Sequence, residues 1–263
     1  MKLGLAIITY KRPEFLKRCL ESLEKNSWGG ATERIVVVDE PPGDSYTDFN
    51  IQVGYTNPSF YFQDNGGVAK AKNRALKELL ARGCDHIFLM EDDQEMLDPN
   101  TCEKYIQYAQ EHKLHHMNFA HHGPQKDRGW YMELRGTHCH ADCVGAFSYY
   151  TKEVLEVVGL MDEEFYNAWE HVEHSYRIAK AGYSLPFWFF ADHPQSRSML
   201  REQEGSIQQS SIRPDAGWTE KMEAGKKYWT SKHGRFLPAR PDLKVLSLGS
   251  DAPLRIIPYD RAD

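Results

Sequence analysis

The chain has 263 residues, of which 41% are hydrophobic and 27% charged, as in globular proteins large enough to bury a substantial core. Its formal net charge of −6 argues against a broadly basic nucleic-acid-binding protein, and no apolar stretch approaches membrane-spanning length. The five cysteines are odd in number and irregularly spaced, which argues against a disulfide framework and favours a reducing, cytoplasmic setting. The apolar start is too short for a signal peptide, so we expect it to form the first strand.

The first hundred residues are predicted to alternate between strands and helices. β-branched apolar runs indicate buried strands, and apolar residues at helical spacing indicate helices. The expected elements are a strand at 3–9, a helix from Pro13, strands at 35–39 and 60–62, a turn at 65–67, a helix at 68–82 and a strand at 86–90. This alternation predicts an α/β fold with a mostly parallel sheet and helices on both faces.

The remainder of the chain is less regular. Helices are expected at 100–112, 152–158 and 169–181, and strands at 143–150, at 187–192 and within the histidine-rich stretch 115–122. Residues 126–135 are polar and aromatic, which favours a loop. The last sixty residues are rich in Pro, Gly and charge, and we expect one helix there, near 219–232.

Polar side chains stand where several predicted strands end. Thr9, Asp39 and the triplet Glu91-Asp92-Asp93 each follow an apolar run. Parallel strands bring their carboxyl ends to one edge of the sheet, which is where such folds bind ligands. Adjacent carboxylates at that edge could hold Mg²⁺ or Mn²⁺ against a phosphate, although a triplet alone is more often a charged, solvated turn.

Six segments occur in an order that resembles a known family: residues 7–13, 36–39, 65–75, 88–93, 158–163 and 169–177. Together they are similar to the GT-A glycosyltransferases of the family-2 type, over roughly residues 1–185. The resemblance implies a Rossmann-like GT-A fold for nucleotide-diphospho-sugar transfer. We expect one catalytic domain at 1–200, with a nucleotide-sugar-binding half at 1–98, an acceptor-binding half at 99–200, and a C-terminal extension at 201–263.

The resemblance also implies a donor and its binding residues. Family members use a nucleoside-diphosphate sugar, commonly UDP-linked, with Mn²⁺ or Mg²⁺. Thr9 and Tyr10 match the loop beneath the nucleoside, Arg12 lies in the same segment, and Asp39 matches the residue that hydrogen-bonds the base. In place of the usual Asp-x-Asp the chain has Glu91-Asp92-Asp93, which implies Asp92 near the ribose and Asp93 on the metal.

The segment from Asn65 to Arg74 is a second candidate for donor binding. Gly66 and the following glycine lead into a helix whose first N–H groups could face an anion, and Lys70 and Arg74 lie one turn apart. The alternative is a plain turn followed by a solvated basic face.

The catalytic base is expected at Glu170-His171, where the family usually has an acidic pair. His171 is slightly favoured, because an imidazole is basic near neutral pH and a helix N-terminus disfavours its charged form. Glu170 could instead be the base, or both could be ordinary residues of a first helical turn. His193 follows the aromatic strand and is a candidate metal ligand by resemblance, or a hydrogen-bonding residue at a strand end.

Two segments look like zinc sites but do not fit. Residues 170–174 have histidines three apart, whereas a zinc-protease helix needs them four apart. Residues 137–143 hold two histidines and two cysteines but lack a second ligand pair at structural-site spacing, so we expect core cysteines there.

The sequence therefore predicts a metal-dependent inverting glycosyltransferase. A sugar-nucleotide nucleotidyltransferase is the second hypothesis, weakened because the segment after the first strand, Tyr10 to Pro13, contains no glycine. A non-catalytic nucleotide-sugar-binding module is the third. The acceptor stays open among a glycan, a lipid-linked sugar, a protein and a modified DNA base.

Overall fold

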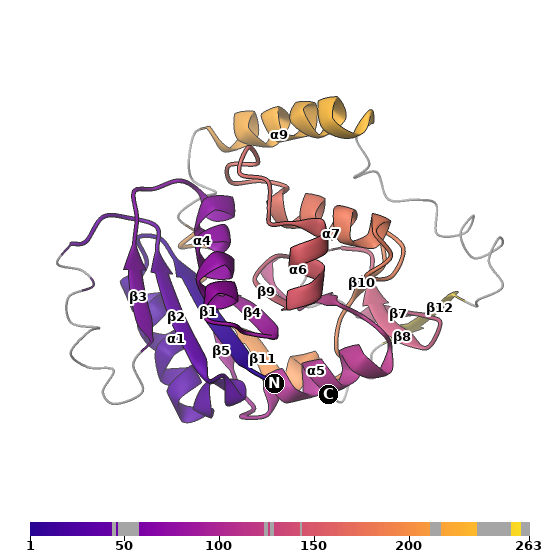
Figure 1. Cartoon of the computed structure of the whole chain (residues 1–263), viewed down its shortest axis with the longest axis horizontal. Coiled ribbons are helices and arrows are strands. Elements are labelled where there is room, and N and C mark those ends of the chain that lie inside the picture. Colours follow the sequence, from indigo (N-terminus) through magenta and orange to yellow (C-terminus); the bar gives the residue numbers. More distant parts are fainter. Residues whose placement is uncertain are drawn as a thin grey trace.

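The computed structural model describes residues 1–43, 46, 58–123, 126, 129–142, 144–210, 217–235 and 254–258 (Figure 1). The helices are α1 (Pro13–Lys25), the short 3₁₀ helix η1 (Ser27–Gly30), α4 (Val68–Ala81), α5 (Thr101–Glu111), α6 (Lys152–Val158), α7 (Glu170–Lys180), α8 (Ser196–Met199) and α9 (Trp218–His233). The strands are β1 (Leu3–Thr9), β2 (Glu33–Val38), β3 (Ser59–Phe62), β4 (His86–Glu91), β5 (Gln94–Met96), β6 (His116–Asn118), β7 (Trp130–Leu134), β8 (Thr137–His140), β9 (Phe147–Thr151), β10 (Phe190–Ala191), β11 (Leu200–Glu202) and β12 (Leu254–Pro258).

The central sheet has the order β3-β2-β1-β4-β9-β6. Strands β1 to β4 pair in parallel, and β9 runs antiparallel between β4 and β6. The chain builds outward from β1 through β2 to β3 and then returns to place β4 on the other side of β1. Ligands bind beyond the strand ends where the order reverses in this way. A ligand site is therefore expected beyond the carboxyl ends of β1 and β4.

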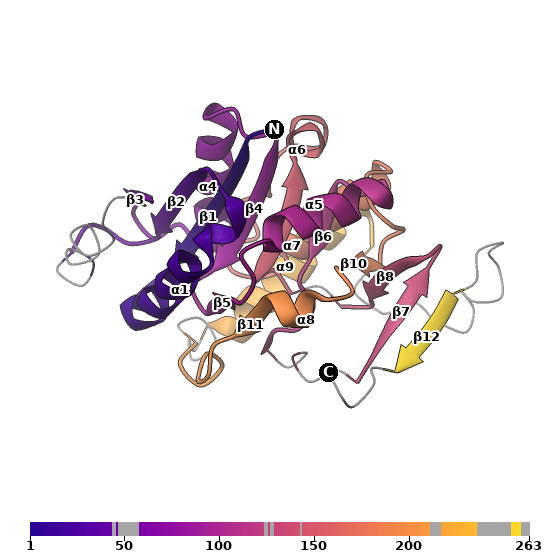
Figure 2. The same ribbon diagram turned by 90° about the horizontal axis from the view of Figure 1, so that it is seen from below.

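Two hydrophobic cores flank this sheet, one on each face. All seven residues of β1 are buried, and Leu5 and Ile7 belong to one core while Ala6 and Ile8 belong to the other. Helices α1 and α5 pack in the first core, and α4, α6 and α7 in the second (Figures 1 and 2). The predicted sheet with helices on both faces is confirmed.

Outside the central sheet, two expectations were wrong. The predicted loop at 126–135 contains β7, which pairs with β8 and β12 in a small antiparallel sheet. Its alternation, with Met132 and Leu134 buried, was hidden by the polar and aromatic residues between them. The aromatic run 187–192 is a strand only at Phe190–Ala191, because Trp188 has a left-handed φ of 85°. Strand β9 begins at Phe147, and Cys143 lies outside the described residues.

The described parts of the C-terminal segment pack on the rest of the chain. β11 pairs with β5. The predicted helix near 219–232 is confirmed as α9, whose buried Trp229 lies 5.4 Å from the Tyr176 ring of α7. The domain boundary at residue 200 stays a prediction. Within the described residues, no helix is both long and apolar enough to cross a membrane.

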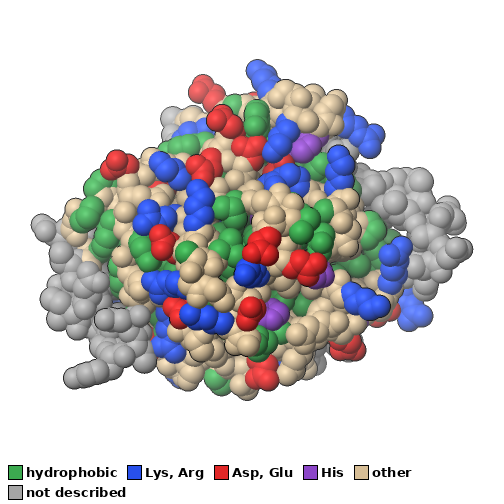
Figure 3. All heavy atoms as spheres, in the orientation of Figure 1, with side chains coloured by type: hydrophobic (Ala, Val, Ile, Leu, Met, Phe, Trp, Pro, Cys, Tyr) green, Lys and Arg blue, Asp and Glu red, His purple; other side chains and the backbone are tan. Residues whose placement is uncertain are grey.

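The surface in Figure 3 mixes both signs of charge. Lys and Arg side chains alternate with Asp and Glu across this face, without a broad patch of one sign. That distribution agrees with the net charge and offers no extended basic surface to a nucleic-acid backbone on this side.

Candidate active site

The acidic triplet lies at the carboxyl end of β4, next to the end of β1. The backbone N–H of Asp92 donates to the carbonyl of Ile8 at 3.1 Å, and that of Glu91 to Ala146 at 2.7 Å. Asp92 is fully buried and Asp93 almost so, whereas Glu91 is half-buried. These contacts turn the chain so that adjacent carboxylates are held beneath the sheet edge instead of pointing into solvent.

Thr9 and Arg12 neutralise and orient the buried carboxylates. The Thr9 hydroxyl donates to Asp92 at 2.6 Å, and the Arg12 guanidinium contacts both Asp92 and Asp93, the latter at 3.1 Å. Burial raises the pKa of Asp92. Burial acts in the same direction on Asp93, but the neighbouring His122 and Arg12 outweigh it and lower the pKa of that carboxyl. Asp93 is thus the member of the pair held ionised for a cation.

Lys72 is a buried ammonium that lies between Glu91 and Glu170. It is 1% exposed, and its Nζ lies 2.9 Å from Glu91, 3.4 Å from Glu170 and 3.0 Å from the Gly145 carbonyl. Burial alone would lower the pKa of Lys72, but Glu91 and Glu170 reverse this and raise it. One lysine of α4 therefore links the acidic end of β4 to the start of α7.

Replacing Lys72 with methionine should strongly destabilise the protein. Removing one partner of a buried ion pair leaves uncompensated charge and costs about 3–5 kcal/mol. Because the pKa of Glu170 is lowered to about 2 in the folded protein, its pairing stabilises the fold above the unfolded pKa of about 4.3 and is lost as pH falls toward 2. The K72M deficit, measured by urea unfolding, should thus shrink in acid.

The matched control is K70M, because Lys70 is exposed on the same helix. It should leave the urea midpoint unchanged. A K72M midpoint equal to wild type at pH 7 would show that the ion pairs of Lys72 contribute little.

Glu170 and His171 form a hydrogen-bonded pair at the start of α7. Glu170 Oε1 lies 3.0 Å from His171 Nδ1, and the side chains are 5% and 20% exposed, so the imidazole is the more accessible member. Burial opposes ionisation of Glu170, yet His171 and Lys72 lower its pKa to about 2. A Cβ on Gly145 would lie 2.8 Å from His171 Cγ and 2.9 Å from Lys72 Nζ, so only glycine allows this close approach.

A cavity of about 340 Å³ joins these groups. Glu91, Asp93 and His122 lie on its wall together with Arg12, and Glu170 and His171 line it as well. The remaining lining includes segments beyond residue 200, through Glu202, Ser206, Trp218 and Met222. The volume is within the range of about 300–1,000 Å³ usual for small-molecule sites.

The donor atoms at the acidic end fit a divalent cation. Glu91, Asp93 and His122 each offer one ligand atom, and these atoms lie within 4.8 Å of one another. His122 Nε2 is 4.0 Å from Asp93 Oδ2. Carboxylate oxygens with one imidazole suit a hard ion such as Mn²⁺. Arg12 contacts Asp93, and Lys72 contacts Glu91. A bound ion would therefore share each carboxylate with one of these positively charged side chains.

Asp39 organises the turn before α4. Its carboxylate accepts hydrogen bonds from Gln63 Nε2 at 2.7 Å and from the N–H groups of Gly66 and Gly67 at 3.1 and 3.0 Å. Asn65 Oδ1 also accepts from Gly67, at 3.1 Å. Gly67 has a φ of 84°, and a Cβ there would meet the Tyr166 carbonyl at 2.2 Å. The anion that these N–H groups bind in the structure is the Asp39 carboxylate. Contacts of Asp39, Asn65 and Gly66 with a nucleotide stay predictions.

The other candidates are placed apart from the acidic end. Lys70 and Arg74 are exposed, and Arg74 pairs with Glu78 at 3.0 Å and stacks on Tyr61. Neither they nor Tyr10 line the cavity. The His193 ring packs 5.1 Å from Tyr108, and its Nδ1 accepts from the Gln195 N–H. His193 as a metal ligand stays a prediction, whereas His122 is the histidine that lies beside Asp93 among the described residues.

The sequence reasoning missed Lys72 and His122, and each left a signal. Lys72 lies four residues from both Val68 and Leu76, so it falls within the apolar stripe of α4. His122 ends the histidine-rich stretch that contains β6, a strand that ends at the same sheet edge as β4. A lysine at a core position and a histidine just beyond a strand end were the clues.

Comparisons of the sequence with known proteins identify a family. The model of Glycosyl transferase family 2 matches residues 5–175. A relative described as "Uncharacterized glycosyltransferase R363", from Acanthamoeba polyphaga mimivirus, is 28% identical over 254 residues, which are 90% of this chain and 95% of the relative.

Solved structures of S. aureus TarS share the fold. One aligns with a TM-score of 0.59 and 14% identity over 95% of this chain and 46% of its own. Another structure, of TarS 1–349 in complex with UDP, aligns with a TM-score of 0.52 and 17% sequence identity. The alignment covers 68% of this chain and 55% of the TarS chain. The chain thus spans about half the length of these structures. Because the family model matches residues 5–175, more than half of the chain and as far as the Glu170-His171 pair, the chain belongs to glycosyl transferase family 2 and is a GT-A glycosyltransferase.

Proposed function

We propose that this enzyme is a metal-dependent, inverting glycosyltransferase that moves a sugar from a UDP-linked donor to an acceptor hydroxyl. The observation that carries the proposal is the single cavity that is lined both by the carboxylates of β4 with His122 and by the Glu170-His171 pair. A donor diphosphate would lie against the acidic end, and the acceptor would approach His171.

The chemistry follows from these placements. His171 Nδ1 faces Glu170, so Nε2 would take the proton from the acceptor hydroxyl while Glu170 stabilises the resulting imidazolium. The acceptor oxygen then forms a bond to the anomeric carbon as the bond to the diphosphate breaks on the opposite side, which inverts the configuration. Mn²⁺ or Mg²⁺ held by Glu91, Asp93 and His122 would neutralise charge on the departing diphosphate. Arg12 adds fixed positive charge at that end.

UDP is the nucleotide to test first, because TarS has been solved with UDP and with UDP-GlcNAc. The whole chain would be incubated with a panel of UDP-sugars and Mn²⁺, and released UDP measured. We expect slow hydrolysis of at least one donor and calorimetric UDP binding that weakens when EDTA removes the metal. The absence of both UDP release from every UDP-sugar and metal-dependent UDP binding would overturn the proposal.

The acceptor side is proposed to be completed by the C-terminal segment. Trp218 and Met222 line the cavity together with Trp169, whose Nε1 donates to the Met222 carbonyl at 3.2 Å. Aromatic faces of this kind stack on apolar faces of sugars as well as on other planar groups. The extension beyond residue 200 would thus help select the acceptor.

A further inference from the structure

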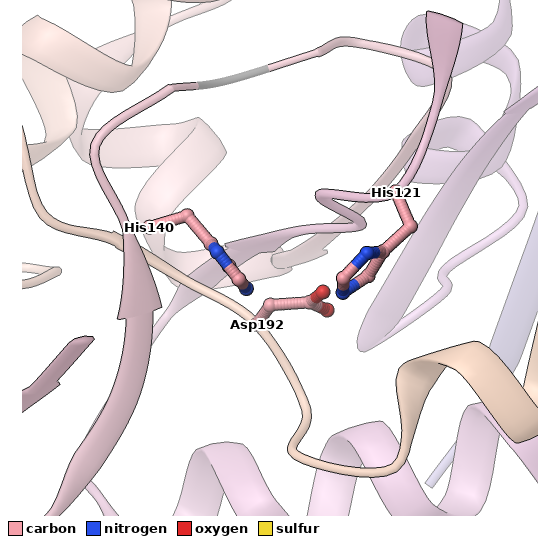
Figure 4. Close-up of side chains that lie close together, drawn as sticks. All are labelled: His121, His140 and Asp192. Atoms are coloured by element: carbon pink, nitrogen blue, oxygen red, sulfur yellow. The ribbon is translucent and has the colours of Figure 1, made fainter. Parts of the chain in front are cut away.

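A second group of metal-binding side chains lies apart from the acidic end of β4. His121, His140 and Asp192 each present one ligand atom, and these atoms lie within 4.8 Å of one another. The residues are 4%, 0% and 0% exposed. Figure 4 shows the two imidazoles and the carboxylate pointing toward one another from three separate segments, namely the chain after β6, strand β8 and the chain after β10.

The Asp192 carboxylate is buried among neutral donors. It accepts hydrogen bonds from the Tyr105 hydroxyl at 2.7 Å, the Ser196 hydroxyl at 2.8 Å, and the N–H groups of His193 and Ala120 at 2.8 and 3.1 Å. Within the part of the chain that the structure describes, no lysine or arginine forms an ion pair with it. Buried charges are normally paired or bound to a metal, so this site has negative charge for a cation to balance.

The two histidines supply ligands of the complementary kind. The His138 and His140 Nε2 atoms lie 3.0 Å apart, the distance of a hydrogen bond in which one ring N–H donates to the nitrogen of the other ring. Imidazole nitrogens with one carboxylate favour a transition metal over Mg²⁺. Ligand atoms around tetrahedral zinc, at about 2.0 Å from the ion, lie about 3.3 Å from one another, so modest side-chain shifts would close the group.

We propose that His121, His140 and Asp192 bind a Zn²⁺ ion that has a structural role and is separate from the ion at the acidic end of β4. The hydroxyls of Tyr105 and Ser196 can rotate, so one of them would yield its place on the carboxylate to the ion. The other donors would then orient the ligating carboxylate, as hydrogen bonds around metal ligands commonly do.

The placement gives the ion a task in the fold. His121 immediately precedes His122, the histidine beside Asp93, and Ala120 already donates to Asp192. A zinc ion would connect the segment that holds His121 and His122 to β8 and to the chain after β10. It would thereby hold His122 in place at the active site. The competing interpretation is a metal-free cluster of hydrogen-bonded aromatic rings, with the His121 and His140 rings 5.3 Å apart.

The test measures bound metal directly. The untagged whole chain would be loaded with zinc sulfate, dialysed against metal-free buffer and assayed for zinc by mass spectrometry. We expect about one equivalent in wild type and in D93N, which lacks a ligand of the other group. H140Q and D192N should retain less than a tenth of that amount, whereas H116Q, which removes a buried histidine outside both groups, should retain zinc.

Cobalt substitution guards against variants that fail to fold. Wild type loaded with Co²⁺ should show ligand-field absorption, and H140C should keep the ion while gaining thiolate-to-metal charge-transfer absorption, because cysteine is also a zinc-site ligand. Wild type without zinc or cobalt binding would overturn the proposal. So would zinc retained by D192N, or an H140C cobalt spectrum identical to that of wild type.

Discussion

D93N is expected to lower kcat/KM by about a thousandfold, and UDP affinity should fall with it. Asparagine keeps the shape of the side chain but removes the charge that a divalent ion requires. Loss of about 4 kcal/mol of leaving-group stabilisation corresponds to this factor. Mn²⁺ titration of UDP release and calorimetry of UDP binding would measure both effects.

The control for D93N is D98N. Asp98 also lies in a turn and pairs with a lysine, Lys104, but it is absent from the cavity lining. The loss of the Asp98 charge in D98N should leave the turnover rate and its dependence on Mn²⁺ as in wild type. If D93N instead turns over donor and binds UDP normally, the assignment of the metal and diphosphate to the end of β4 is wrong.

H171Q is expected to lower kcat by about 10²–10⁴-fold while changing the donor KM little, because a general base acts in the transition state and not in donor binding. Glutamine fills similar space and can still accept a hydrogen bond, but it cannot take a proton. Steady-state transfer to an acceptor, once one is found, gives kcat, and donor hydrolysis serves until then. H115Q, which removes a half-buried histidine absent from the cavity lining, should behave as wild type.

The pH profile separates His171 from Glu170. A carboxylate whose pKa is lowered to about 2 is unprotonated throughout the range of an assay, so a Glu170 base gives a kcat that is flat from about pH 4 upward. A kcat that changes with pH within this range would therefore argue against Glu170 and for His171 as the base. A flat profile, together with an active H171Q and an inactive E170Q, would transfer the role to Glu170.

The central fold could be predicted because local patterns determine it. The β-branched runs of β1 and β2, the apolar stripe of α4 and the carboxylates after β4 are all visible within short windows of sequence. Parallel pairing then places the strand ends together without further information. These features led to the correct sheet, helices and family.

The side-chain partners could not be predicted, because they depend on contacts between distant segments. Lys72 meets Gly145 and Glu170 across 73 and 98 residues of sequence. The two residues proposed to bind zinc with His140 could not be found within 137–143, since His121 follows β6 and Asp192 follows β10. Strand β7 likewise depends on β8 and β12, and its own composition resembles that of a loop.

The bridge that Lys72 makes from Glu91 to Glu170 has a consequence for mutagenesis. A change of charge at Glu91 or at Glu170 alters the electrostatic energy of the other carboxylate, because both pair with the same ammonium. Substitutions at these two residues should therefore not have additive effects on activity. A double-mutant cycle of E91Q with E170Q should give a large interaction energy, because residues in one ionic network seldom act independently. The ion pairs of Lys72 would then couple departure of the diphosphate to deprotonation of the acceptor, and this coupling would be present in the enzyme without substrate.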